Sequence, residues 1–193
     1  SSGEVFFEAS TRGNPNKKYV IGVDPASEVD NFSIVVLEIN DDHRRVVYCW
    51  TTTRERHRET LKSKLTEEND FYGYCARKIR NLMKIFPTVE IAMDPQGGGI
   101  AVMESLHDKN KTKEGELPIW PKINPDKPSD TDGESGLHII EVMNFASASW
   151  TGEANHGLRK DMEDKAILFP FFDAASLGLS LEEDKRNNRM HDT

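Results

Sequence analysis

The sequence predicts an α/β protein with a central mixed β-sheet flanked by helices, and three observations lead to this class. Segments 19–23 and 33–39 are apolar, rich in β-branched residues and separated by a polar turn, which is typical of antiparallel strands. Segment 45–52 repeats the pattern after a second polar turn, so the first three strands form a meander. A helical pattern over 70–86 then leads into an apolar strand at 88–93, and such a crossover joins parallel strands.

The helix over 70–86 has the clearest periodicity. Its apolar residues recur every three or four positions and therefore share one face. Asn69 or Asp70 can cap the first turn, and Pro87 ends the helix because it cannot continue the hydrogen-bond ladder. The apolar face consists of Phe71, Cys75, Ile79, Leu82, Met83 and Phe86.

The second half of the chain has weaker patterns. A polar connection covers 109–128, with an apolar island at 117–120 that we assign to no element, and an acidic loop follows at 129–136. The elements predicted beyond the strand at 88–93 are a helix at 100–106, a strand at 137–145, a helix within 149–164 and a short extended piece at 167–170.

Composition describes a soluble globular protein. The chain has 193 residues, 36% of them hydrophobic and 30% charged, which suits one domain with its own core. No apolar run approaches the ~18 residues of a membrane helix, and residues 1–18 are polar, so we expect no secretory signal there. Cys49 and Cys75 lie far apart, and we expect two buried free thiols in a reducing compartment.

The net charge of −8 argues against a domain that coats nucleic acid by bulk electrostatics. It leaves room for an enzyme that touches DNA through local basic patches. The basic segments 54–64 and 109–113 are the candidates, and the alternative for 54–64 is a solvated connection or helix face.

Two predicted strands end in the same way, with an apolar run followed by Asp and Pro. The two acids are Asp24 and Asp94. If the strands are neighbours, two like charges meet at one edge of the sheet, which is unfavourable unless a cation lies between them. Carboxylate oxygens select Mg²⁺ or Mn²⁺, and two such ions about 4 Å apart support phosphodiester hydrolysis. The alternative is that each Asp simply caps a turn.

A run of three glycines, 97–99, follows Asp94 and opens the next predicted helix. Glycines let the backbone approach a ligand, and a helix N-terminus favours anions, so this loop could hold a nucleic-acid phosphate. The alternative is a flexible loop. No GK[ST] sequence ends the run, which excludes an ATP-binding P-loop.

This order of elements resembles the RNase H-like superfamily and, more narrowly, the nuclease domain of large terminase subunits from tailed bacteriophages. The resemblance is carried by YVIGVDPASEVDNFSIVVLEI and VEIAMDPQGGGIAVMESL, with weaker support from LHIIEVMNF and ANHGLRKDMEDKAILFP. It implies an RNase H-like nuclease domain over 19–193, with 1–18 as a linker or the end of a preceding domain. It also implies that Asp24 and Asp94 are the catalytic residues and ligands of a two-metal Mg²⁺ or Mn²⁺ site.

The resemblance further implies an endonuclease that cuts concatemeric double-stranded viral DNA. The implied partners are the terminase ATPase domain, the small terminase subunit and the portal, with no membrane. The implied location is the cytoplasm of the infected bacterial host and, transiently, the procapsid portal. The family has a further acid near the end of the domain. Either Asp173 takes this place, or the acid lies beyond residue 193 and the C-terminal part is incomplete, while Asp161 and Asp164 are expected to be surface charges.

Other assignments remain open at this point. The fold also suits another RNase H-like nuclease, such as a junction resolvase, or a non-catalytic docking module of the packaging motor. A sugar kinase or actin-like ATPase needs two similar domains and more chain. We expect structural roles for His138 and His156 rather than general-base roles, and core positions for Trp120 and Trp150 rather than base stacking.

Overall fold

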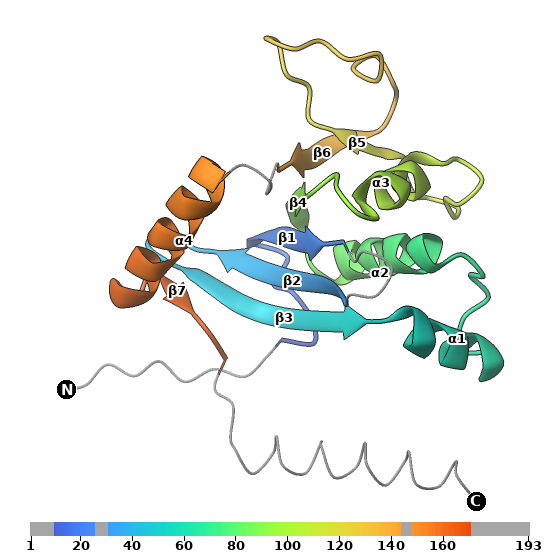
Figure 1. The fold of residues 1–193 in the computed structure, drawn as a ribbon, viewed down its shortest axis with the longest axis horizontal. Helices are drawn as coiled ribbons and strands as arrows, with labels where there is room; N and C mark the ends of the chain where they lie inside the picture. Colours follow the sequence, from blue (N-terminus) through green and yellow to red (C-terminus); the bar gives the residue numbers. More distant parts are fainter. Residues whose placement is uncertain (1–9, 26–30, 144–147, 171–193) are drawn as a thin grey trace, which may run out of the picture.

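The structure is a computed structural model that describes residues 10–25, 31–143 and 148–170. These residues form a seven-stranded sheet in the order β5-β6-β4-β1-β2-β3-β7, with four helices (Figure 1). The strands are β1 Lys18–Asp24, β2 Phe32–Ile39, β3 Arg44–Thr52, β4 Thr88–Met93, β5 Ile119–Pro121, β6 Leu137–Val142 and β7 Ile167–Leu168. The helices are α1 Arg54–Lys62, α2 Phe71–Ile85, α3 Gly99–His107 and α4 Ala148–Glu163.

The sheet is mixed, as the sequence predicts. Strands β1, β2 and β3 form the antiparallel meander. After the crossover through α2, strand β4 lies parallel to β1, and β6 and β5 extend the parallel part. Strand β7 adds a short parallel edge to β3. The α/β class and the crossover are therefore confirmed.

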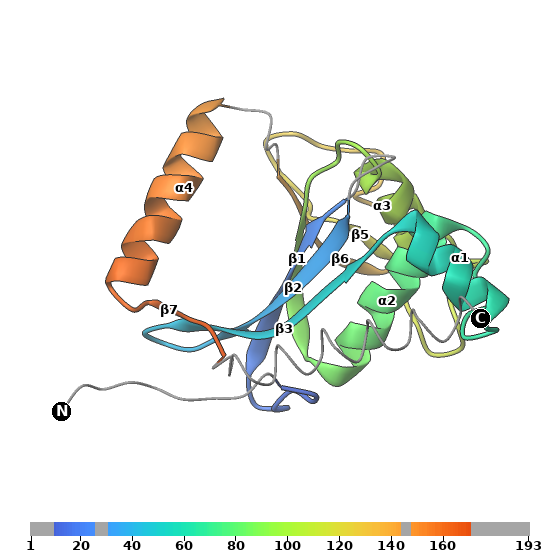
Figure 2. The ribbon, with the colours of Figure 1, turned by 60° about the horizontal axis from the view of Figure 1, so that its bottom comes forward.

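The helices are divided unequally between the two faces of the sheet. Figure 2 shows α1, α2 and α3 on one face and α4 on the other. The core lies under α2 and α3, where Ile21, Ile34, Ile79 and Ile91 are fully buried. By contrast, Leu158 on α4 stays 46% exposed. Each fully buried side chain of this size contributes roughly 1.5–3 kcal/mol, so the α2 side dominates the stability of the domain.

Helix α2 begins where its cap fixes it. Of the two candidate caps, Asp70 is the one used: its Oδ2 accepts a hydrogen bond from the Gly73 amide at 2.7 Å. Phe86 follows the last turn in an extended conformation, as expected for a residue before Pro87. The predicted apolar face is the buried one, and Cys75 within it is fully buried.

The basic segment after β3 begins as helix α1, one of the alternatives that the sequence left open, and its His57 is buried, with Nε2 within 2.7 Å of the Glu68 carbonyl oxygen. Two features differ from the sequence-based expectations. The apolar island contains a strand, β5, which periodicity missed because three residues are too few to show a pattern. The prediction of a buried Cys49 is wrong: this thiol is exposed, because it alternates onto the sheet face away from α2.

The described part of the N-terminal segment follows the domain closely. The Ser10 amide donates to the Val47 carbonyl at 2.8 Å, and the Gly13 amide donates to the Ile85 carbonyl at 3.1 Å. The assignment of 1–18 as a linker and 19–193 as the domain stays a prediction. Among the described residues, no helix has the length and apolar character needed to cross a bilayer.

Candidate metal centre

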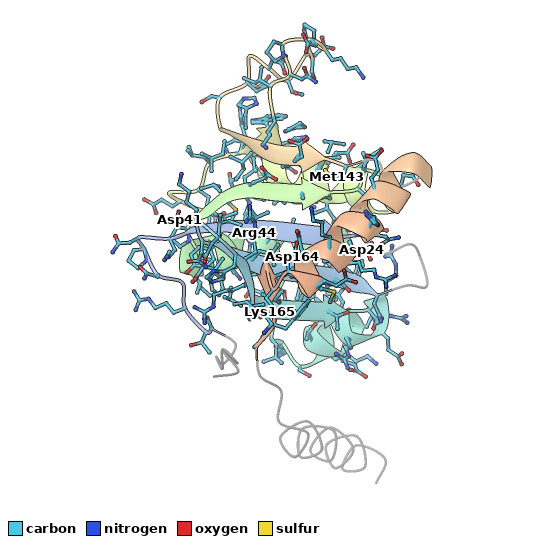
Figure 3. All side chains as sticks on the ribbon, turned by 90° about the vertical axis from the view of Figure 1, so that its left-hand side faces the viewer. Asp24, Asp41, Arg44, Met143, Asp164 and Lys165 are labelled. Atoms are coloured by element: carbon cyan, nitrogen blue, oxygen red, sulfur yellow. The ribbon has the colours of Figure 1, made fainter. Side chains whose placement is uncertain are left out.

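The two acids follow neighbouring parallel strands. Val23 of β1 is in register with Met93 of β4, so Asp24 and Asp94 come next at the same border of the sheet. Figure 3 shows Asp24 at this border, together with Met143 just after β6, while Asp41 lies at the opposite border. The sequence-based expectation that these two strands are adjacent is thus confirmed, and the twin Asp-Pro motifs converge because both strands run in the same direction.

The turn after β4 fixes Asp94. Its Oδ1 accepts a hydrogen bond from the Gln96 amide at 2.8 Å, and the residue is only 8% exposed. The Gly99 amide returns to the Gln96 carbonyl at 3.0 Å, so the chain turns directly into α3. Asp24, in contrast, is exposed at the end of β1. One carboxylate is therefore held rigidly by its turn, and its neighbour faces solvent.

The glycine run has a structural purpose. Gly97 has a left-handed backbone, with φ of 59°, which a residue without a Cβ adopts at little cost. A Cβ at Gly99 would lie 1.9 Å from the Asp94 carbonyl oxygen and 3.3 Å from Cγ of Pro25. The turn after Asp94 therefore packs against Pro25, the residue after Asp24. Turn geometry and packing explain Gly97 and Gly99, and phosphate binding by the loop stays a prediction.

We expect Gly99→Ala to disturb this centre specifically. A methyl group cannot fit 1.9 Å from a backbone oxygen, so the turn must shift, at a cost of about 1–3 kcal/mol. Gly133→Ala is the matched control, because nothing lies within 4 Å of its added Cβ. Chemical denaturation of both variants measures the effect. Equal stability of the two variants would contradict the close contact.

Asp24 and Asp94 suit a hard divalent cation. Carboxylate oxygens on adjacent strand ends repel each other when both are ionised, and a cation between them removes that cost. Among the residues that the structure describes, no group of three or more His, Cys, Asp or Glu side chains is arranged to hold a metal ion. Two carboxylates supply only part of a coordination shell, so a cation held by Asp24 and Asp94 would keep several water ligands, as Mg²⁺ does.

Among the described residues, no third carboxylate joins Asp24 and Asp94 in a group that could hold a metal ion. Asp173, the sequence-based candidate, lies outside the described residues. Asp161 and Asp164 are exposed at the C-terminal end of α4. That end leads into β7, which pairs with Arg44 and Arg45 at the start of β3, on the border opposite Asp24. These two acids are surface charges, as expected from the sequence.

The remaining candidate side chains are structural or remote. Trp120 is 8% exposed and stacks on His107 with ring centroids 4.1 Å apart. The two ring nitrogens of His138 lie 3.0 Å from the Pro121 carbonyl and 2.9 Å from the Glu134 carbonyl, so this side chain links strand β5 to the loop before β6. His156 is exposed on α4, and the side chain of Trp150 lies outside the described residues. None of the described histidines therefore replaces the acids as the chemical centre.

A mixed sheet with this strand order, flanked by helices, matches the RNase H-like fold that the sequence predicts. The fold is that of the nuclease domains of phage large terminases. It superposes on the large terminase nuclease of thermophilic phage G20c with bound magnesium at a TM-score of 0.53, with 13% identity, covering 82% of this chain and 61% of that one. The superposition on the zinc-bound G20c nuclease has a TM-score of 0.51 at 13% identity. It covers 82% of this chain and 67% of that one. The superposition on the large terminase of a second thermophilic bacteriophage has a TM-score of 0.51 at 10% identity. It covers 88% of this chain and 32% of that one.

This chain thus spans about three fifths of the G20c nuclease in its magnesium-bound form and about one third of the second phage's large terminase. No family model matches the sequence. No curated protein is significantly similar to it either. At identities this low, the comparisons establish the fold alone.

Proposed function

We propose that this chain is the nuclease domain of a large terminase subunit, a divalent-metal-dependent endonuclease that cuts concatemeric double-stranded DNA during viral packaging. The observation that carries the proposal is the convergence of Asp24 and Asp94 at one border of an RNase H-like sheet. The similar G20c nuclease binds magnesium in one structure and zinc in another, which supports a divalent cation here.

Asp24 and Asp94 would hold the cation, and the site is proposed to take two Mg²⁺ or Mn²⁺ ions. When bound, the metal supplies charge neutralisation at the phosphate and a more acidic water. The protein contributes rigidity. The Gln96 amide fixes the Asp94 carboxylate, and contact between Pro25 and the Gly99 turn keeps the two acid-bearing turns together. Such preorganisation is what makes a small number of charged groups effective.

The wider setting is part of the same proposal. The chain would act beside a terminase ATPase domain, a small terminase subunit and the portal, in the cytoplasm of an infected bacterium and at the procapsid. Similarity in fold to large terminases supports the proposal of these partners, and one of those terminases was solved in complex with ADP.

The test is cleavage of supercoiled plasmid DNA by the 193-residue chain. We expect nicked and linear products with Mn²⁺ or Mg²⁺, and none with EDTA, because the acids alone cannot neutralise the phosphate. A four-way junction and a linear duplex serve as parallel substrates. Cleavage confined to the junction would indicate a resolvase, and DNA binding without cleavage under any metal would indicate a docking module; either result overturns the proposal.

A further inference from the structure

Arg54, the first residue of α1, lies at the same border as the two acids. Strand β3 ends at Thr52, which pairs with Phe32, and the next residue of β2, Ser33, pairs with Asp24. Two strand spacings, about 10 Å, separate the ends of β1 and β3. The backbone therefore brings a cation close to the proposed metal centre.

The surroundings of Arg54 hold it without neutralising it. Nη2 donates a hydrogen bond to the Tyr72 hydroxyl at 3.0 Å. The guanidinium carbon lies 4.8 Å from the centre of the Phe71 ring and 4.9 Å from that of Tyr72. Of the carboxylates in the described ranges, none forms a salt bridge with Arg54. A half-buried guanidinium has five donors, so this one retains capacity for an anion.

Tyr72 connects Arg54 to the turn that carries Asp94. A Cβ at Gly98 would lie 2.0 Å from Cε1 of Tyr72 and 2.7 Å from its hydroxyl oxygen. The tyrosine ring therefore lies directly against the glycine run, and its hydroxyl positions the guanidinium beside it. Gly98 is small because the ring occupies the space of a side chain.

Three other basic residues, on α2 and in the second basic segment, differ from Arg54 in having acidic partners. Lys111 from the second basic segment pairs with Asp70 at 3.2 Å. Arg77 pairs with Glu116 at 2.7 Å, and Lys84 with the same carboxylate at 2.8 Å. Each of these three cations has an acidic partner within the fold, whereas the contacts of Arg54 with described side chains are to aromatic rings and a neutral hydroxyl.

We infer that Arg54 binds a DNA backbone phosphate next to the phosphate at the metal centre, and so positions the strand for cutting. The planar guanidinium can hold a phosphate with two parallel hydrogen bonds, a geometry that a lysine cannot reproduce. The inference rests on the proposed function and narrows the basic segment 54–64 to one positioning residue. Arg54 takes no part in the bond-breaking step itself.

Arg54→Gln tests this inference by binding of a short fluorescent duplex over a salt series. We expect about tenfold weaker binding and a salt slope reduced by about 1, since one phosphate contact is lost. Mn²⁺ binding, measured by calorimetry, is expected to be unchanged. Arg56→Gln is the matched control, because it makes the same charge change about 200° around helix α1 from Arg54. We expect its salt slope of DNA binding to be close to that of the unmodified chain.

Arg54→Lys provides a second measurement that does not depend on removing the charge. It keeps the cation, so we expect the original salt slope with at least about threefold weaker binding, because the bidentate geometry is lost. If Arg54→Gln fails to fold, the DNA affinity of Arg54→Lys tests the inference by itself. If the folded Arg54 variants bind DNA as tightly as the unmodified chain, and the unmodified chain cuts DNA, the role of Arg54 is overturned and the proposed function stands. A chain that neither binds nor cuts DNA would overturn the proposed function with it.

Discussion

Asp94→Asn is expected to reduce Mn²⁺-dependent plasmid cleavage at least about a hundredfold, because it removes half of the charge that would hold the metal. Asparagine keeps the side-chain oxygen that accepts from the Gln96 amide at 2.8 Å. The turn should therefore survive, and loss of activity would report on charge rather than on folding. Asp24→Asn should have the same effect, and thermal unfolding of both variants should stay close to that of the unmodified chain.

Asp164→Asn is the control for these two variants. It makes the same charge change on an exposed acid at the C-terminal end of α4, on the side of β7. We expect it to leave cleavage unchanged. Full cleavage by both the Asp24 and the Asp94 variants would mean that the converging acids are turn caps and that they do not hold the catalytic metal.

Glu116→Gln is expected to cause the largest loss of stability. The Glu116 side chain is 7% exposed and lies 2.7 Å from Arg77, 2.8 Å from Lys84 and 3.8 Å from Arg80. Arg80 also donates to the Leu106 and Leu117 carbonyls, so this cluster joins α2 to the loop before β5. Neutralising the acid leaves a buried arginine without its counter-charge, which costs about 3 kcal/mol.

The same cluster predicts how stability depends on pH. Burial alone would raise the pKa of Glu116, but hydrogen bonds from Arg77, the Lys113 amide and Lys84 outweigh it and lower the pKa from 4.5 to about 2. Because the folded pKa lies below the unfolded one, this stabilisation is complete above pH 4.5 and is lost as the pH falls to about 2.

Urea unfolding at several pH values checks both expectations. Glu116→Gln should unfold more easily at neutral pH and should lose less further stability between pH 4.5 and about 2 than the unmodified chain. Glu141→Gln is the control, since its carboxylate is 43% exposed and pairs with Lys122 at 3.0 Å. An exposed pair of this kind contributes about 0–1 kcal/mol. A larger effect at Glu141 than at Glu116 would contradict the burial argument.

Local sequence was sufficient for the main elements of the fold. The β-branched runs predicted β1 and β2, and the spacing of the apolar residues predicted α2, because period and propensity are properties of neighbouring residues. The crossover then required β4 to be parallel to β1. From there the convergence of Asp24 and Asp94 followed, since parallel neighbours end at the same border.

Contacts between segments that are distant in the sequence could not be predicted from local periodicity and propensity. The exposure of Cys49 depends on which face of the sheet α1, α2 and α3 cover, and Cys49 alternates onto the other face. Strand β5 is defined by its pairing with β6 rather than by its own three residues. The Arg80–Glu116 and Arg54–Tyr72 contacts join residues 36 and 18 positions apart, and no pattern in the sequence marks them.

The sequence by itself determined that this protein is an α/β domain with paired acids after two strands, because strand and helix periods are visible in adjacent residues. Only the tertiary structure decided which basic residues are already neutralised, why the glycines after Asp94 are needed, and which thiol is exposed. The physical reason is that burial and charge compensation depend on the packing of whole elements against one another, which is fixed by the folded chain and not by any one segment of it.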